Sequence, residues 1–176
     1  LTGKVVDPTT TTGVSGATVQ IYDQKNSCYL TGKEVTTGST GTFTISNVPI
    51  RTMTGNKPYR LDVSKSGYCS SRKNNVTVAR GETTNVGSLY IMETTGKSKG
   101  TIGGTVVDAN TAYTLESSVA IIDGVGGSAS TTTSESTFGT FITDTQLDPG
   151  IYSVKITKAG YYDMVKDNVV VNGNKN

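Results

Sequence analysis

Tyr59-Arg-Leu-Asp-Val-Ser-Lys-Ser-Gly-Tyr68 and Tyr152-Ser-Val-Lys-Ile-Thr-Lys-Ala-Gly-Tyr161 decide how this chain folds. Both stretches read Tyr-x-apolar-x-apolar-hydroxyl-Lys-small-Gly-Tyr, and they begin 93 residues apart, at positions 59 and 152. Apolar residues at every second position predict a half-buried β-strand. A match over the whole stretch, without a gap, indicates that one β-module is written twice.

Shorter matches surround this pair and extend the repeat. Gly3-Lys-Val-Val-Asp7 returns as Gly104-Thr-Val-Val-Asp108, and Gly41-Thr-Phe43 returns as Gly139-Thr-Phe141. The offset between the copies falls from 101 (position 3 to 104) to 93 (position 59 to 152). Such a fall is expected when loops are shortened and strands are kept, since loops tolerate deletions that strands do not.

The rest of the pattern predicts an all-β chain with two domains. Ala17–Asp23 and Thr42–Val48 alternate apolar and polar residues, and no stretch shows helical periodicity. Short strands separated by turn residues are typical of a β-sandwich. Glu93–Gly100 contains no apolar residue and is predicted to be a linker. We therefore expect one sandwich over residues 1–92, a linker over 93–100 and a second sandwich over 101–176.

The composition excludes several classes of partner. Charged residues make up 17% of the 176-residue chain, and the net charge is +2, which is too small to indicate binding to nucleic acid or to an anionic membrane. No apolar run approaches the roughly 20 residues of a membrane-spanning helix. The chain begins at Leu1 inside a strand pattern, as expected of a processed mature chain or an excised fragment.

The second copy lacks a strand that the first copy has. The first copy ends in Asn85-Val-Gly-Ser-Leu-Tyr-Ile91, and residue 176 corresponds to residue 83, before that strand begins. The loss predicts an open sheet edge, which invites pairing with another strand. One explanation is that the chain is shortened or that the second copy is a six-stranded variant. The other is that another chain supplies the seventh strand of the second copy. We expect the pairing edge at four residues, Ile102, Val106, Val169 and Val171.

The order of these motifs resembles that of the carboxypeptidase regulatory-like domain, a transthyretin-like β-sandwich, and is similar to that of Cna B-type surface repeats. The resemblance covers both copies. It implies two tandem transthyretin-like or immunoglobulin-like sandwiches in a non-enzymatic protein that is extracellular or on the cell surface. It allows a structural role as a filament or stalk subunit that self-associates or meets other surface proteins. The alternative is an accessory module of a larger secreted protein that binds carbohydrate or protein.

No catalytic constellation and no cofactor site is predicted. The chain has no histidine, which excludes the Ser-His-Asp arrangement and histidine-bearing zinc sites. Aspartates recur at strand ends in both copies, where carboxylates bind calcium or, more commonly, shape turns. These weak calcium candidates are Asp7, Asp23, Asp108 and Asp123.

Three further groups of side chains are candidates for covalent modification or binding. Cys28 and Cys69, both in the first copy, are predicted to form a disulfide, the alternative being two buried thiols. Asn75-Val-Thr77 fits the acceptor pattern for N-glycosylation. Four tyrosines are expected either to form an exposed aromatic platform that binds sugars or to pack as structural residues: Tyr22, Tyr68, Tyr161 and Tyr162.

Overall fold

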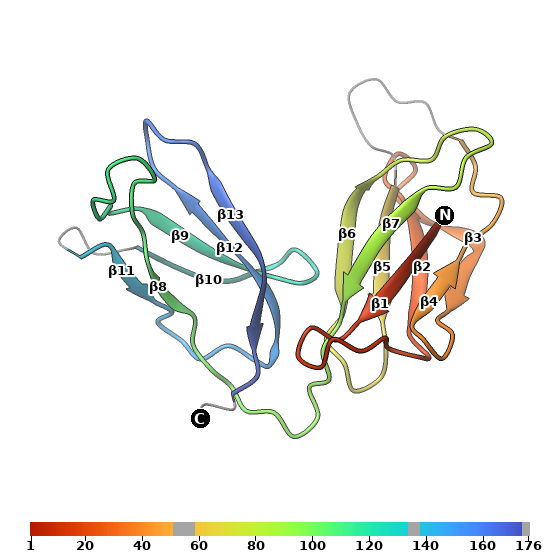
Figure 1. Cartoon of the computed structure of the whole chain (residues 1–176), viewed down its shortest axis with the longest axis horizontal. Helices are drawn as coiled ribbons and strands as arrows, with labels where there is room; N and C mark the ends of the chain where they lie inside the picture. The colour runs from red at the N-terminus through yellow and green to blue at the C-terminus, as the bar shows by residue number, and fades with distance from the viewer. Residues whose placement is uncertain (51–58, 134–137, 174–176) are drawn as a thin grey trace. The chain divides into compact units, whose positions relative to one another are not determined.

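Every regular element in the described part of this protein is a β-strand. The structure is a computed structural model that describes residues 1–50, 59–133 and 138–173. The chain forms two compact units, Leu1–Thr95 and Gly96–Asn176 (Figure 1). In the residues described, no helix is long and apolar enough to cross a membrane. The prediction of two tandem all-β domains is therefore confirmed.

The first unit is a two-layer β-sandwich. One sheet has the strand order β4-β1-β7 and the other has the order β3-β2-β5-β6. Strand β1 lies between β4, which runs antiparallel to it, and β7, which runs parallel to it (Figure 1). The seven strands are β1 Thr2–Val6, β2 Thr18–Asp23, β3 Cys28–Thr36, β4 Thr42–Thr44, β5 Tyr59–Ser64, β6 Ser71–Val76 and β7 Asn85–Tyr90.

The core of the first unit follows the alternation in the sequence. Tyr59, Leu61 and Val63 on β5 are buried, as are Val19 and Ile21 on β2, which pairs with β5. Each fully buried apolar side chain of this kind contributes roughly 1.5–3 kcal/mol. The hydroxyl of Tyr59 donates a hydrogen bond of 2.7 Å to the carbonyl oxygen of Pro49, so the polar end of this buried ring is also satisfied.

Within its described residues, the second unit repeats this plan with one strand fewer. One sheet has the order β10-β9-β12-β13, and the other consists of β11 and β8 alone. Tyr152 on β12 is buried and donates to the carbonyl oxygen of Asp148 at 2.7 Å, as Tyr59 does to Pro49. The six strands are β8 Gly103–Thr105, β9 Ser118–Asp123, β10 Ser128–Thr133, β11 Thr140–Ile142, β12 Gly150–Thr157 and β13 Met164–Val171.

Strand register confirms that the two units are copies of one module. Gly3 lies opposite Phe43 in the first unit, and Gly104 lies opposite Phe141 in the second. The loop after β1 is closed by a hydrogen bond from the Thr11 nitrogen to the Asp7 oxygen, with Thr11 at φ 59°. The loop after β8 is closed in the same way between Ala112 and Asp108, with Ala112 at φ 60°. Even an unfavourable left-handed backbone is therefore repeated.

Two segments show features that the sequence did not indicate. Strand β6 passes Asn75 at φ 63° in a β-bulge and is paired with β5 on both sides of it. The segment predicted as a linker also contributes to both units. The Thr94 nitrogen bonds to Gly67 in the first unit, and the Gly100 nitrogen bonds to Leu147 in the second.

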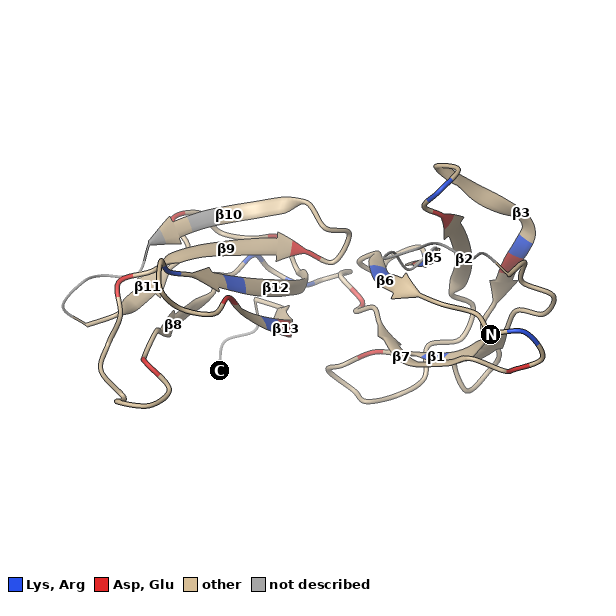
Figure 2. Ribbon diagram, turned by 90° about the horizontal axis from the view of Figure 1, so that it is seen from above, with Lys and Arg blue, Asp and Glu red and all other residues tan. Residues whose placement is uncertain are grey.

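Charged side chains are spread over both units. Figure 2 shows Lys and Arg interspersed with Asp and Glu, on loops as well as on strands. The structure thus agrees with the small net charge of the sequence, +2.

Candidate functional site

The clearest candidate for a binding site is the outer edge of β8. The Val106 nitrogen donates to Gly139 at 2.8 Å and the Leu115 nitrogen donates to the Val106 oxygen at 2.9 Å, so the backbone of Val106 faces the β11 side. Because backbone groups alternate along a strand, those of Gly103, Thr105 and Val107 face the opposite side. We call this side, Gly103–Val107, the acceptor edge. No strand in the described residues pairs with it.

The same edge is filled in the first unit. Strand β7 lies parallel to β1, with Thr2 opposite Asn85 and Val6 opposite Tyr90. The Thr2 nitrogen donates to the Thr84 oxygen at 2.9 Å, and the Ile91 nitrogen donates to the Val6 oxygen at 3.2 Å. Strand β7 therefore satisfies the backbone groups whose counterparts on β8 form the acceptor edge.

Strand β7 also covers an aromatic ring in the first unit, and the corresponding ring in the second unit is less covered. A Cβ atom built on Gly3 would lie 2.7 Å from both Val86 and the Phe43 ring, so these three residues pack tightly together. Phe43 is 5% exposed as a result. Phe141, its counterpart, packs over Gly104 but is only half-buried. The acceptor edge is therefore accompanied by an incompletely covered apolar surface.

The four residues predicted for the pairing edge lie on β13 or directly beside β8, and their side chains point to the core. Ile102 and Val106 belong to the buried core, as does Val171, and Val169 is half-buried against that core. Strand β13, which carries Val169 and Val171, is an outer strand of its sheet, but so is β6 in the complete first unit. The edge that the missing strand leaves open is therefore that of β8, through its backbone groups.

Asp7 and Asp108 shape the loops after β1 and β8. Asp7 accepts hydrogen bonds from the nitrogen and hydroxyl of Thr9 at 2.8 and 2.7 Å. Burial would raise the pKa of Asp7, but the hydrogen bonds that its carboxylate accepts, chiefly from Thr9, together outweigh burial and lower the pKa. Asp108 accepts bonds from the nitrogens of Asn110 and Thr111, both at 2.8 Å, and the bond from Thr111 is the main cause of its lowered pKa.

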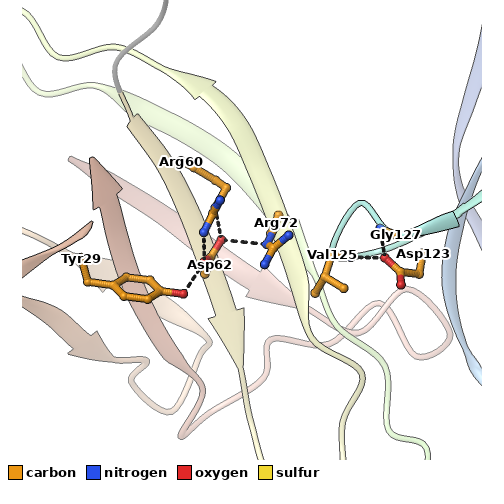
Figure 3. A network of polar contacts seen from close by, with 7 residues as sticks. All are labelled: Tyr29, Arg60, Asp62, Arg72, Asp123, Val125 and Gly127. Carbon is orange, nitrogen blue, oxygen red and sulfur yellow. Dashed lines mark hydrogen bonds and ion pairs between the residues drawn. The ribbon is translucent and has the colours of Figure 1, made fainter. Parts of the chain in front are cut away.

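Asp23 and Asp123 have the same kind of role at the other predicted calcium positions. Asp123 accepts from the nitrogens of Val125 and Gly127 at 2.9 and 2.7 Å (Figure 3). Asp23 accepts from the nitrogens of Lys25 and Asn26. Among the described residues, no group of three or more His, Cys, Asp or Glu could hold a metal ion. The geometry of all four aspartates is that of side chains that stabilise turns.

The structure contradicts a disulfide between Cys28 and Cys69. Cys28 is exposed and lies opposite Asp23, which lies opposite Tyr59 at the start of β5. Cys69 follows the other end of β5, and its sulfur accepts a hydrogen bond from the Met92 nitrogen at 3.2 Å. A strand of this length spans about 17–20 Å, whereas a disulfide needs Cα atoms within about 7 Å. Both residues are thiols, and the prediction was wrong because spacing along the chain does not reveal which end of the sheet each residue reaches.

Asn75, the glycosylation candidate, has a structural role that the repeat explains. It is exposed, and its φ of 63° places it in the left-handed region, which asparagine tolerates better than most residues. Asn168, its counterpart on β13, has a φ of 61° and also lies at a register shift. Asn168 is not in an acceptor triplet. The asparagine is therefore shared because of the bulge, and glycosylation of Asn75 remains a prediction.

The four tyrosines predicted as a platform divide between packing and exposure. The Tyr22 ring contacts Tyr29 edge to face and lies 3.9 Å from the Arg60 guanidinium, and Tyr68 packs against the core of the first unit. Tyr161 and Tyr162 in the second unit are 46% and 99% exposed. Half of the candidates are therefore structural, and the other half lie on the surface of the incomplete unit.

A polar cluster on the outer face of the β3-β2-β5-β6 sheet was not anticipated. Asp62 accepts two bonds of 2.6 Å from Arg60 and one of 2.7 Å from Tyr29, and Arg72 lies 3.4 Å away (Figure 3). Burial would raise the pKa of Asp62, but the hydrogen bonds from Arg60 and Tyr29 outweigh it and lower the pKa. The signal was the outward-facing pair Arg60 and Asp62 within the signature strand.

This cluster makes the stability of the first unit sensitive to acid. Because the folded-state pKa of Asp62 lies below its ordinary value of 3.8, the carboxylate stabilises the fold above that value, and the contribution is lost as the pH falls through the folded-state pKa. Replacing Asp62→Asn should therefore flatten the pH dependence of the unfolding free energy below about pH 4. Urea titrations at several pH values test this, with Asp163→Asn, an exposed carboxylate of the second unit, as the control. An unchanged acid profile would contradict it.

The profile of the carboxypeptidase regulatory-like domain family matches residues 1–89. A search of the curated proteins finds no match. Solved structures similar to this chain include a streptococcal ancillary pilin, with a TM-score of 0.36, 14% identity and coverage of 99% of this chain and 58% of that one. The Bacillus anthracis TIE protein has a TM-score of 0.36 and 19% identity, with coverage of 98% and 31%. The shaft pilin SpaA from Lactobacillus rhamnosus GG has a TM-score of 0.31 and 14% identity, with coverage of 95% and 91%.

These structural similarities are too weak to carry an argument about function. The chain spans 58% and 31% of the lengths of the first two structures. The family profile is different in kind, because it covers half of the chain, from β1 into the last strand of the first unit, β7. The second unit repeats the β1–β4 pairing as β8–β11 and the β2–β5 pairing as β9–β12. This chain therefore belongs to the carboxypeptidase regulatory-like domain family.

Proposed function

We propose that this chain is a non-enzymatic structural protein of the cell surface or extracellular space, whose second unit is completed by a strand from another chain. The observation that carries the proposal is the pairing of β8: among the described strands it pairs with β11 on one side only, whereas β1 pairs with β4 and β7. A row of unpaired backbone groups on an edge strand is a template for pairing. Strand addition of this kind is a recurring mode of protein recognition.

The energetics favour completion of the second unit. In the first unit β7 and the residue after it bury Val86, Leu89 and Ile91, each worth roughly 1.5–3 kcal/mol. A whole domain is stable by only about 5–15 kcal/mol. A unit that lacks these three side chains therefore gains a large fraction of its stability when a strand is added.

A structural role agrees with the chemistry of the chain. Histidine is absent from the sequence, and the aspartates at strand ends bind their own turns. The arginine–carboxylate cluster on Asp62 is closed by partners from the same sheet. The family resemblance implies a stalk or adhesive segment of a secreted protein, and this role is proposed here.

A proline at the acceptor edge tests the assembly. Thr105→Pro removes a backbone N–H that faces the open side, and it leaves the pairing with β11 in place. We expect the wild-type chain to form oligomers whose proportion grows with concentration, and the variant to remain monomeric. Sedimentation velocity over a range of concentrations makes the measurement.

Ile142→Pro is the matched control. Ile142 lies on β11, and its backbone faces away from β8, because the neighbouring Thr143 nitrogen bonds to Ile102. That side is also an outer edge in the first unit, where β4 ends the sheet. The control should assemble as the wild type does. A wild-type chain that stays monomeric at all concentrations would refute donation between chains, and loss of assembly in the control alone would move the interface to β11.

A further inference from the structure

We infer that the donated strand follows a path longer than β8 itself, from the acceptor edge to the β12–β13 connection, where Asp108 and Tyr162 receive its far end. This inference rests on the proposed function, since it specifies the strand that completes the second unit. The template for the path lies in the first unit, where both β7 and the residues after it are described.

The template continues beyond β7 into the other layer of the sandwich. Past Tyr90 the chain runs through Met92–Thr94 and lies against Gly67–Cys69, the connection between β5 and β6. The Cys69 nitrogen donates to the Met92 oxygen at 2.9 Å, and the Thr94 nitrogen donates to the Gly67 oxygen at 2.8 Å. One continuous segment thus joins the edge of one sheet to a connection of the other.

The corresponding connection in the second unit has the same shape and is uncovered. Tyr68 closes its turn with a bond of 3.1 Å to Lys65, and Tyr161 closes its own with a bond of 3.1 Å to Lys158. Tyr162 takes the place of Cys69, 93 residues further along the chain, and is 99% exposed. Large exposed apolar side chains therefore lie at both ends of the path, Val107 at the acceptor edge and Tyr161 and Tyr162 at the connection.

Asp108 stands where the path turns from one sheet to the other. In the first unit the Glu93 nitrogen donates to Asp7 at 3.4 Å, just beyond the end of β7. Asp108 occupies the same place in the repeat, and its carboxylate accepts a bond from the Tyr161 side chain. A carboxylate at this position can receive a backbone N–H of an incoming strand in addition to those of its own loop. Asp108 is therefore assigned as an anchor for the donated strand.

The template also defines the chemistry of the donated strand. It runs parallel to β8, and it carries apolar side chains at the positions of Val86, Leu89 and Ile91. The residue after the first of these is Gly87, at φ 72°, a conformation that favours glycine. The expected occupant is a strand of another chain with the pattern apolar-Gly-x-apolar-x-apolar.

A peptide with the sequence of residues 83–94, Thr-Thr-Asn-Val-Gly-Ser-Leu-Tyr-Ile-Met-Glu-Thr, serves as the probe. We expect it to bind the intact chain and to slow amide hydrogen exchange at Gly103, Thr105 and Tyr162, which correspond to the amides that the template engages. Exchange at Thr2 and Lys4 in the first unit should not change. A peptide with Lys in place of Leu89 should bind at least tenfold more weakly, because it would bury an unpaired charge.

Variants of the anchor test the far end of the path. Asp108→Ala should weaken peptide binding several-fold, since one charge-assisted hydrogen bond is lost. Asp108→Asn, which keeps an acceptor oxygen for the loop, should have a smaller effect in the same direction. Asp123→Asn, in a turn of the other sheet, should have none. Protection at β8 without protection at Tyr162, or equal affinities for all variants, would overturn the longer path.

The two proposals fail in different ways. A chain that binds the peptide along the whole path and yet remains monomeric at all concentrations would retain the path and refute donation between chains. A chain that assembles through Thr105 but shows no protection at Tyr162 would retain donation and refute the path. Absence of any binding by the peptide would also refute the path, because the peptide carries every feature of the template.

Discussion

Replacing Gly41→Ala is expected to lower the free energy of unfolding of the first unit by about 2–5 kcal/mol. Gly41 has a φ of 78°, and a Cβ atom there would lie 2.4 Å from the Val5 oxygen and 2.7 Å from the Val14 nitrogen. The substitution thus combines an unfavourable backbone with a collision against two backbone atoms that cannot rotate away. A Cβ atom on Gly139 would lie 2.4 Å from the Val106 oxygen, so the same replacement should damage the second unit.

Gly16→Ala separates the two contributions. Gly16 has a φ of 71°, but a Cβ atom there would meet nothing within 4 Å. Its replacement should cost only the backbone term, about 1–2 kcal/mol. Urea denaturation of both variants makes the comparison. Equal losses would show that the sandwich absorbs the collision at Gly41 and that the packing there is looser than described.

Ile91→Ala is expected to destabilise the first unit by about 2–5 kcal/mol. The side chain is fully buried immediately after β7, in the segment whose counterpart the second unit lacks. Removing most of it leaves a cavity between the two sheets. The measured loss sets the scale of what a donated strand contributes to the second unit.

Ser88→Ala is the control on the same strand. Ser88 is exposed, so its replacement should change the unfolding free energy by no more than about 0.5 kcal/mol. Thermal and urea unfolding of the two variants give the difference. A loss below about 1 kcal/mol for Ile91→Ala would mean that the last strand adds little, and the energetic case for strand donation would weaken with it.

The architecture could be predicted from the sequence because it depends on period and repetition. Alternation on Tyr59–Ser64 identified a strand with one buried face, and the same pattern at Tyr152 identified its copy. The repeat also predicted which strand of the first unit, β7, has no counterpart beside β8 among the described residues. These inferences need only the order of residues along one strand.

Features that depend on contacts between neighbouring strands could not be predicted from the sequence. Asp62 on β5 accepts hydrogen bonds from Tyr29 on β3 and from Arg60 on its own strand. The sequence does not reveal that β3 and β5 lie on either side of β2, which brings Tyr29 within reach of Asp62. The Cys28–Cys69 prediction failed for the same reason. The uncovered surface at Tyr162 became recognisable only when the first unit showed what covers Cys69.

The bulges at Asn75 and Asn168 have a consequence for how safely such a protein can be concentrated. Each lies at a register shift in the outer strand of the larger sheet, and on β13 the regular pairing with β12 is interrupted between Lys166 and Val169. Cross-β fibrils are built from straight segments of about six or seven residues. The asparagine bulges therefore shorten the regular segments of these outer strands and are expected to disfavour edge-to-edge pairing, even where Met164 and Val165 lie exposed.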